Sequence, residues 1–403
     1  MASPPREGGA KAFAIADPRV SDRVQHFPES VIREMTRLAN RHQAINLSQG
    51  FPDFDPPKEI LEAARRALLE GYNQYATTWG AEDFRQAIAE SALRFQGLQV
   101  DPDAHVVVTC GATEAMMAAM LSLIDPGEEV VILEPFYENY GPDAFVSGAR
   151  PVFVRMEWPS YRLDEEALKA AFRRNTKAII LNTPNNPTGR VFDEGTLRLV
   201  ADLCTDHDVV CVTDEIYEHI VYDGRRHVSI ATLDGMWEHT VTISGLSKTF
   251  SVTGWRLGYA LAPRTLTEAM KRTHDFLTVG APHPLQIAGA YALRMDNPYF
   301  EGLREGYTER RAVLFDALTA IGFKCSKPEG AYYIMADIRP LTDMDDVAFS
   351  RFLVEEVGVA VVPGSSFFAD PADGRSFIRF AFPKRIETLQ EAIRRLKKVA
   401  RRG

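Results

Sequence analysis

Residues 240–258 read TVTISGLSKTFSVTGWRLG, an apolar, β-branched run that is followed by Lys248 and, eight positions later, by Arg256. Such a run is typical of a strand that is buried on both faces of a sheet. A lysine directly after a buried strand is either a solvated residue at the start of a helix or a nucleophile held at the edge of the sheet. The loops that follow the other strands distinguish between these two interpretations.

Six further runs of this kind lie between residues 105 and 262, and helix-length segments such as 113–124 and 194–207 separate several of them. The runs are HVVVT (105–109), EEVVILE (128–134), RPVFVRM (150–156), KAIILNT (177–183), DVVCVTD (208–214) and LGYALA (257–262). Strands that alternate with helices predict an α/β domain, in which helices flank a mostly parallel sheet. Ligands bind at the carboxyl ends of the strands in such sheets, so the loops after the strands are where a site is expected.

The C-terminal part of the chain changes character, because long helical stretches there lead to short apolar runs. These runs are GAYYIMADI (330–338), VAVVPGSSF (359–367) and FIRFAF (377–382). This order is typical of a smaller α+β domain. We therefore expect a disordered lead-in at 1–20, an N-terminal segment of the small domain at 21–58, a large ligand-binding domain at 59–295 and a small C-terminal domain at 296–403.

The chain has 403 residues, 45% of them hydrophobic, and a net charge of −9. This composition predicts a folded protein with a sizeable core. Since it contains no basic block, it argues against binding to nucleic acid or to an anionic membrane surface. No apolar run is long enough to span a bilayer, and the N-terminus lacks the apolar core of a signal peptide. The four cysteines show no metal-ligand spacing, so no metal is expected. The expected location is the cytoplasm.

Two loops offer groups that suit a phosphate or a polar ligand atom. In VVVTCGATEAMM a strand run ends, Gly111, Ala112 and Thr113 follow, and a helix begins. Free N–H groups and the positive end of a helix dipole favour a phosphate there. In IILNTPNNPTG the prolines keep the chain extended, which would hold the Asn186 amide at the edge of the sheet. Each stretch is also compatible with an ordinary turn.

Asp214 ends a buried run, and Tyr217 comes three residues later. A buried carboxylate needs a partner. A cationic ring nitrogen of a ligand would supply one, and so would a structural ion pair or the cap of a helix. Ser247 and Arg256 offer phosphate ligands. Ser247 also excludes a P-loop, which requires Gly directly before Lys248.

Each of these features is ambiguous alone, but together they match one ligand. A phosphate cradle, a carboxylate for a cationic ring nitrogen, hydroxyl and amide donors for a phenolate oxygen, and a Schiff-base lysine are the recognition set of pyridoxal phosphate. The sequence therefore predicts a pyridoxal phosphate site that is built around Lys248.

The chain resembles the class I aminotransferases of fold type I. Within them it is most similar to the branch that contains kynurenine aminotransferase, glutamine transaminase K and bacterial methionine aminotransferase. The stretches that carry the resemblance are NLSQGFPDF (46–54), NQYATTWG (73–80), EPFYENY (134–140), LNTPNNPTG (181–189), HDVVCVTDEIYEHIVYDG (207–224), SGLSKTFSVTGWRLG (244–258), PEGAYYIMADI (328–338) and FIRFAF (377–382). They stand in the order of the family, and as a set they are highly specific.

The resemblance implies how the ring of the cofactor is held. Lys248 forms the Schiff base, and Asp214 faces the pyridinium nitrogen. Asn186 and Tyr217 face the ring oxygen, and Tyr137 stacks on the ring. These roles predict that Lys248, Asp214 and Tyr217 carry the catalysis.

The resemblance also implies how the phosphate and the substrate are bound, in a homodimer with shared active sites. The phosphate ligands are Ala112, Thr113, Ser247 and Arg256, joined by Tyr75 of the partner subunit. Arg379 binds the α-carboxylate of the substrate, and Gly50, Asn186 and Ile32 line the same pocket. The expected small-molecule partners are an amino acid and a 2-oxo acid.

The chain departs from the animal kynurenine enzymes where they carry a tryptophan and a Phe-His pair, because it has Ile32 and Gly280–Ala281 there. These departures argue against a preference for kynurenine. The positions that the family places at the side-chain end of the substrate are Ile32, Tyr75, Tyr137, Gly280 and Ala281. None of them is a Lys or Arg, and His283 nearby has the character of a structural or exposed residue.

We therefore expect an aminotransferase that moves an amino group between an L-amino acid with a neutral side chain and a 2-oxo acid. Two alternatives within the fold stay open, an aspartate aminotransferase and a β-lyase of cysteine conjugates. A regulator built on this fold is a more remote alternative. It would need a DNA-binding segment, for which the N-terminal lead-in is too short and the charge has the wrong sign.

Overall fold

The computed structural model describes residues 19–21 and 29–399. The lead-in expected at 1–20 therefore lies almost wholly outside the described residues. In the part of the chain that is described, no helix is both long and apolar enough to cross a membrane. The predicted boundaries between the domains stay a prediction.

The large sheet has eight strands, and it confirms the α/β prediction. In spatial order they are β2 (Val106–Thr109), β9 (Gly258–Leu261), β8 (Thr240–Gly245), β7 (Val210–Asp214), β6 (Thr176–Asn182), β3 (Glu129–Glu134), β4 (Arg150–Glu157) and β5 (Arg162–Leu163). Strand β9 runs antiparallel to both of its neighbours and β5 antiparallel to β4, whereas β4, β3, β6, β7 and β8 are parallel. All seven predicted runs form strands, and β5 is the strand that the sequence analysis missed.

Helices cover both faces of this sheet, which explains the continuous apolar runs. Val131 shares a buried cluster with Leu197 of α7 (Glu194–His207), whereas its neighbour Val130 shares one with Met116 of α4 (Ala112–Leu123). Successive side chains of a strand point to opposite faces, so the two helix layers together bury the central strands on both faces. The other helices around the sheet are α2 (Lys58–Leu69), α3 (Glu82–Gln96), α5 (Tyr140–Ser147), α6 (Glu165–Ala171), α8 (Arg264–Thr278) and α9 (His283–Leu293).

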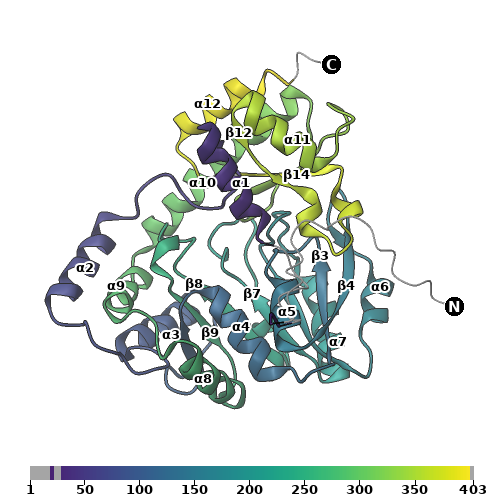
Figure 1. Ribbon diagram of the computed structural model, residues 1–403. Helices are drawn as coiled ribbons and strands as arrows, with labels where there is room; N and C mark the ends of the chain where they lie inside the picture. The colour runs from purple at the N-terminus through teal and green to yellow at the C-terminus, as the bar shows by residue number, and fades with distance from the viewer. Residues whose placement is uncertain (1–18, 22–28, 400–403) are drawn as a thin grey trace.

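A second, smaller sheet lies above the large one in Figure 1 and is built from the C-terminal part of the chain. Its order is β10 (Lys324–Cys325), β11 (Tyr333–Asp337), β14 (Phe377–Ala381) and β13 (Val362–Pro363), and all its pairs are antiparallel. The helices beside it are α10 (Asn297–Ile321), α11 (Asp346–Phe352) and α12 (Ile386–Leu396). This layer is the α+β unit that the short C-terminal runs predict.

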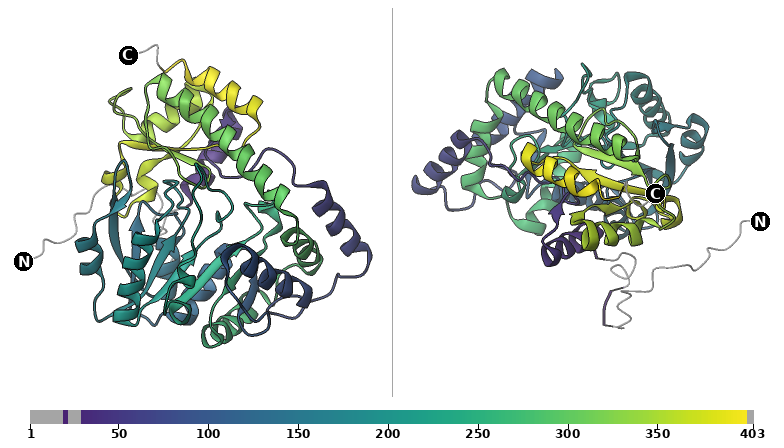
Figure 2. Two further views of the ribbon diagram at one scale, coloured as in Figure 1. Left: turned by 180° about the vertical axis from the view of Figure 1, so that it is seen from behind. Right: turned by 90° about the horizontal axis from the view of Figure 1, so that it is seen from above.

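The N-terminal segment joins the C-terminal layer rather than the large sheet. Helix α1 (Val31–His42) leads to β1 (Ile45–Asn46), which pairs in parallel with β12 (Val359–Ala360). Figures 1 and 2 show α1 beside the small sheet, although the strands of that sheet come much later in the chain. Residues 47–53 then run from this layer towards the carboxyl ends of the large sheet, where the two layers meet.

Candidate active site

A cavity of about 510 Å³ lies between the two layers, where β6, β7 and β8 end and α4 begins. All the predicted site residues except Tyr75 line it. They are Ile32, Gly50, Ala112, Thr113, Tyr137, Asn186, Asp214, Tyr217, Ser247, Lys248, Arg256 and Arg379. The structure therefore brings together residues that are up to 347 positions apart in the chain, counted from Ile32 to Arg379.

One end of the cavity has the donors that a phosphate requires. Helix α4 begins at Ala112 without a side-chain cap, so its first N–H groups face the cavity unused by a capping oxygen. Ser247 and the guanidinium of Arg256 line the same end. A Cβ on Gly111 would overlap the Arg256 guanidinium, so the glycine is what lets the arginine approach the helix end. N–H groups, a hydroxyl and a guanidinium fit a phosphate dianion.

Lys248 lies in the middle of the cavity and is half-buried. Its Nζ donates to the carbonyl oxygen of Gly50 at 3.3 Å and lies 5.8 Å from the ring centres of both Tyr217 and Tyr332. Burial lowers the pKa of this amine to about 8, although the charge of Asp214 opposes the shift. The lowered pKa makes the neutral amine, the form that acts as a nucleophile or base, far more accessible near neutral pH than in an ordinary lysine.

Asp214 sits at the end of β7 with both carboxylate oxygens hydrogen-bonded. Oδ2 accepts from the hydroxyl of Tyr140 at 2.8 Å, and Oδ1 accepts from the backbone N–H of Ile216 at 3.2 Å. Burial raises the pKa of Asp214, and the hydrogen bond from Tyr140 is the largest effect that opposes the rise. A carboxylate in this position suits a cationic ring nitrogen, which would favour its ionised form.

Arg379 on β14 is fully buried, and no carboxylate of the described residues forms an ion pair with it. Its Nη1 donates to Asn186 Oδ1 at 2.8 Å and its Nη2 donates to the carbonyl oxygen of Ser48 at 2.6 Å. Its Nε has no hydrogen-bond partner among the described residues. A buried guanidinium whose charge is not balanced favours an anionic ligand.

Tyr75 is the predicted site residue that the structure does not bring to this cavity. Its side chain is 83% exposed, and it lines a surface hollow together with His283. Gly280 and Ala281 also lie outside the cavity of their own chain. A role for any of them at the active site therefore requires a second subunit.

Among the other residues that line the cavity are Arg33, Tyr140, Asp143 and Tyr333, which the sequence analysis did not single out. Asp143 is buried, and its Oδ2 has no hydrogen-bond partner among the described residues. Burial, together with the charge of Asp214, raises the pKa of Asp143 to about 8. Arg33 is exposed at the mouth. The only sequence signal for Tyr140 is its place three residues after Tyr137, at the start of α5.

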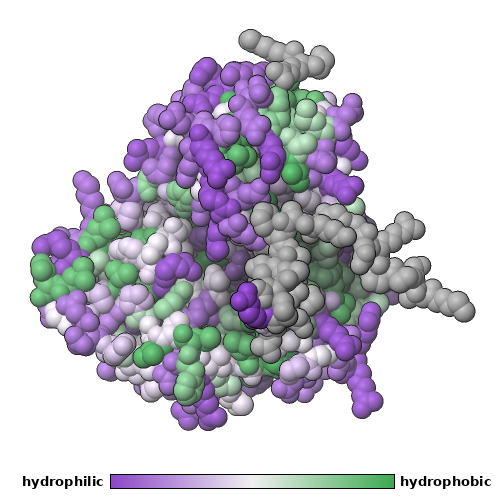
Figure 3. Space-filling model, in the orientation of Figure 1, coloured by the Kyte–Doolittle hydropathy of each residue, from purple (hydrophilic) through white to green (hydrophobic). Residues whose placement is uncertain are grey.

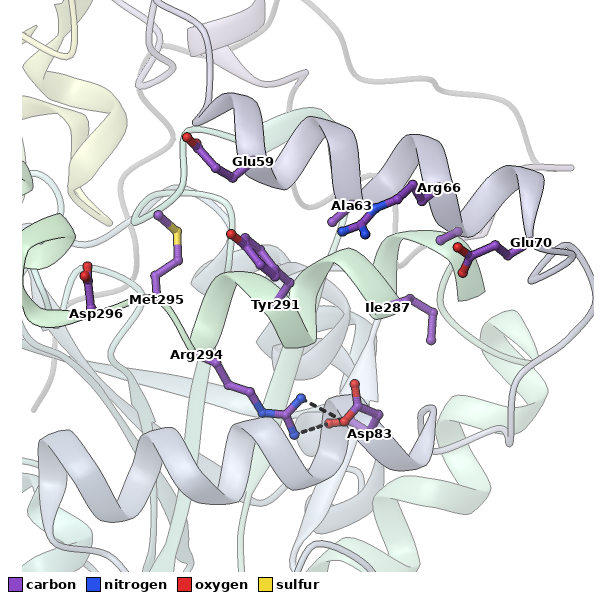
Figure 4. Close-up of a pocket in the computed structure, with 11 residues that line it drawn as sticks. Glu59, Ala63, Arg66, Glu70, Asp83, Ile287, Tyr291, Arg294, Met295 and Asp296 are labelled. Atoms are coloured by element: carbon purple, nitrogen blue, oxygen red, sulfur yellow. Dashed lines mark hydrogen bonds and ion pairs between the residues drawn. The ribbon is translucent and has the colours of Figure 1, made fainter.

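A larger hollow of about 700 Å³ lies between α2, α3 and α9 and does not have this chemistry. Figure 4 shows that Glu59, Arg66 and Glu70 line one side of it. On the other side, Arg294 forms an ion pair with Asp83 at 2.8 Å. Its charged residues are surface groups on helices, and it contains no buried nucleophile, so the cavity around Lys248 is the candidate active site.

The mostly parallel sheet, the lysine directly after one of its strands and the uncapped start of α4 are features of a pyridoxal phosphate-dependent transferase of fold type I. The family model "Aminotransferase class I and II" matches residues 42–396, so the chain belongs to this family. It is a pyridoxal phosphate-dependent aminotransferase, as the resemblance predicts.

Several relatives are similar over nearly the whole chain. A probable N-succinyldiaminopimelate aminotransferase, DapC, of Mycobacterium tuberculosis is 41% identical over 391 residues, which cover 94% of this chain and 98% of the relative. Methionine aminotransferase of Escherichia coli is 35% identical and covers 92% and 96% of the two chains. The structure of N-succinyldiaminopimelate aminotransferase from Mycobacterium tuberculosis superposes with a TM-score of 0.92, at 41% identity, over 94% of this chain and 100% of the other.

The hydrogen bond from Tyr140 to Asp214 gives a prediction about pH. Tyr140→Phe removes the donor that keeps the pKa of Asp214 down, so the carboxylate becomes protonated at a higher pH. The acidic limb of kcat/KM should move up by about one pH unit, since a hydrogen bond to a charged group contributes about 1.5–3 kcal/mol. The measurement is the pH profile of kcat/KM. Tyr161→Phe is the control, because the buried Tyr161 hydroxyl has no partner among the described residues. An unchanged acidic limb in Tyr140→Phe would contradict the claim that the Tyr140 hydrogen bond lowers the pKa of Asp214.

Proposed function

We propose that this aminotransferase moves an amino group between an L-amino acid with a neutral side chain and a 2-oxo acid. The observation that carries the proposal is Arg379, a buried guanidinium that pairs with no carboxylate of residues 29–399 and faces the same cavity as Lys248. One fixed cation of this kind suits the one carboxylate that every α-amino acid and 2-oxo acid has in common.

We assign the remaining roles as the family resemblance implies. The N–H groups of Ala112 and Thr113, with Ser247 and Arg256, would hold the phosphate of the cofactor. Asp214 would face the ring nitrogen, Asn186 and Tyr217 the ring oxygen, and Tyr137 the face of the ring. The support is that all of these residues line one cavity. Asn186 can serve both ligands, since its Oδ1 binds Arg379 while its NH₂ group is free to donate.

Bound pyridoxal phosphate supplies an electron-withdrawing ring, which makes the Cα proton of the amino acid acidic. Arg379 then orients the carboxylate so that this proton points towards Lys248. The Nζ of Lys248, neutral in part because burial lowers its pKa to about 8, takes the proton from Cα. Asp214 keeps a negative charge at the end of β7, which favours a protonated ring nitrogen.

The lining of the cavity supports neutral donors. Its cations are Arg33, Lys248, Arg256 and Arg379, and all but Arg33 have an assigned role. The wall towards α1 is Ile32, which is 8% exposed. A short acidic side chain that does not reach Arg33 would thus lie near Ile32 and Glu138 without a cation, where an unpaired carboxylate is costly.

The test of the proposed function is a panel of amino donors with a 2-oxo acid acceptor. We expect kcat/KM for methionine and phenylalanine to exceed that for aspartate by at least about tenfold, because the second carboxylate of aspartate would be left unpaired. Lys248→Ala should lower turnover at least about 100-fold while cofactor binding persists. A clear advantage for aspartate would contradict the neutral-donor proposal. Pyruvate released from a cysteine conjugate without any acceptor would point to a β-lyase.

Arg33 favours a second candidate function, the transfer of an amino group from a long donor with an anion at its far end. Its side chain is exposed at the mouth of the cavity, and no described carboxylate pairs with it. The Mycobacterium tuberculosis relative is named for N-succinyldiaminopimelate, a donor of this kind. Such a donor would place its α-carboxylate on Arg379 and its distal carboxylate near Arg33.

A comparison of 2-aminopimelate with norleucine separates the two candidates, since only the former has a distal carboxylate. If the enzyme prefers donors with neutral side chains, norleucine is the better substrate. Arg33→Gln then changes kcat/KM for norleucine and for 2-aminopimelate by no more than about twofold. If the enzyme recognises the distal carboxylate, Arg33→Gln lowers kcat/KM for 2-aminopimelate alone by about 5- to 30-fold, the range that corresponds to a charge-assisted contact of about 1–2 kcal/mol. The control is Arg37→Gln on the same helix, because Arg37 pairs with Glu29 and does not line the cavity.

We further propose a homodimer in which Tyr75 of the partner subunit completes the phosphate site. Exposed apolar side chains surround the segment that carries Tyr75, and Figure 3 shows apolar surface near the end of α2 and over α8. Leu69 is 74% and Phe276 92% exposed. A contact joins the segment after α2 to the start of α9, which follows α8 in the chain: His283 Nδ1 lies 3.0 Å from the carbonyl oxygen of Gln74. A second copy of the chain would bury this apolar surface. It would also bring the exposed Tyr75 to the phosphate site of the other subunit.

The dimer proposal is tested by Phe276→Glu, which places a charge in the apolar surface without disturbing the core. We expect sedimentation velocity to show a shift towards monomer, with activity falling in proportion, because each site would lose its partner tyrosine. The control is Met344→Glu, since Met344 is 47% exposed and lies away from this surface. A fully active monomer would refute the shared site.

A further inference from the structure

Tyr333 makes two contacts that join the proposed substrate end of the cavity to the cofactor end. It lies on β11, is 2% exposed and lines the cavity. Its hydroxyl lies 2.9 Å from the hydroxyl of Tyr217, and its ring centre lies 4.2 Å from the guanidinium carbon of Arg379. One side chain is therefore in contact with both the proposed carboxylate anchor and the tyrosine that would face the ring oxygen.

The backbone at Gly50 fixes the hydroxyl of Tyr333 from the other side. A Cβ on Gly50 would overlap the Oη of Tyr333, so only glycine allows this approach. The carbonyl oxygen of Gly50 in turn accepts hydrogen bonds from Tyr332 Oη at 2.7 Å and from Lys248 Nζ at 3.3 Å. The Tyr333 hydroxyl is thus held between Gly50 and Tyr217 and has little freedom to move.

We propose that Tyr333 is a positioning residue that supports Arg379 with its ring and directs the Tyr217 hydroxyl with its own hydroxyl. This inference rests on the proposed roles of Arg379 and Tyr217. A tyrosine has one hydroxyl proton. If Tyr217 donates that proton to the ring oxygen of the cofactor, the 2.9 Å contact requires Tyr333 to be the donor to Tyr217. The order of donation is then from Tyr333 to Tyr217 and from Tyr217 to the ring oxygen.

The guanidinium contact is a separate effect. Arg379 pairs with no carboxylate in the described part of the chain, and its guanidinium carbon lies over the ring of Tyr333 and 5.0 Å from the ring centre of Phe367. The negative face of an aromatic ring stabilises such a cation. Loss of the ring should therefore weaken carboxylate binding, whereas loss of the hydroxyl alone should not.

Two substitutions at Tyr333 separate the contacts, and both are measured on the cofactor-loaded enzyme. Tyr333→Phe keeps the ring and removes the hydroxyl. Weaker donation by Tyr217 leaves the ring oxygen of the cofactor more basic. The ring oxygen then stabilises more strongly the proton that lies next to it in the bound cofactor. The pH midpoint of the absorbance change of the bound cofactor should therefore rise by about half to one unit. The dissociation constant of 3-phenylpropionate, measured by calorimetry, should stay within about twofold.

Tyr333→Leu removes both contacts. It should raise the pH midpoint in the same way and also weaken 3-phenylpropionate by about 3- to 10-fold. Tyr161→Phe is the control and should change neither quantity. If Tyr333→Leu does not fold, the Phe variant still decides the hydroxyl claim, because it keeps the shape of the core.

The outcomes distinguish this inference from the proposed function. A wild-type enzyme that transaminates, together with a Tyr333→Phe variant whose pH midpoint is unchanged, overturns the positioning role and leaves the proposed function intact. A Phe variant that binds 3-phenylpropionate as weakly as the Leu variant also overturns it, because the ring and hydroxyl would then not act separately. A wild-type enzyme that does not transaminate overturns both.

Discussion

The charge of Arg379, which is buried and which no carboxylate of the described residues balances, is the constraint on which the site depends. Burying a guanidinium costs free energy unless hydrogen bonds and opposite charge compensate it. Here two oxygens, of Ser48 and Asn186, and the faces of Tyr333 and Phe367 compensate it in part. The Nε is left without a partner among the described residues. In the proposed function, the α-carboxylate of an amino acid or a 2-oxo acid would supply the negative charge that Arg379 lacks.

A segment distant in the chain contributes to the site, because Arg379 also donates to the carbonyl oxygen of Ser48. Residues 47–53 are held by the small sheet and its flanking loop through their backbone: the carbonyl oxygen of Leu47 accepts from Ala381 N–H at 2.8 Å, and that of Phe51 accepts from Lys384 Nζ at 2.7 Å. Between these two points, Gly50 reaches Lys248 from the other layer. Both proposed chemical functions, the carboxylate anchor and the base, are therefore fixed relative to one backbone segment.

Much of this arrangement could be predicted from the sequence, because its parts have local patterns. Buried strands give continuous apolar runs, and the loops after them carry Asp214, Asn186 and Lys248 at the edge where ligands bind. Tyr140 and Tyr333 were missed for the opposite reason. Tyr333 directly follows Tyr332, and Tyr140 comes three residues after Tyr137, so the sequence pattern alone does not show which tyrosine hydroxyl the tertiary fold turns towards the cavity. The two-residue strand β5 was missed because it is too short to have a period.

The assignment of Lys248 as the cofactor lysine is the central claim, and one measurement tests it directly. Purified protein is reduced with borohydride in the presence of pyridoxal phosphate, digested, and mapped by mass spectrometry. Lys384 is the informative rival, because it is also buried and burial lowers its pKa to about 8 as well. The structure predicts that the reduced cofactor is attached to the peptide containing Lys248 and to no other. Attachment at Lys384, or no attachment to any lysine, would contradict it.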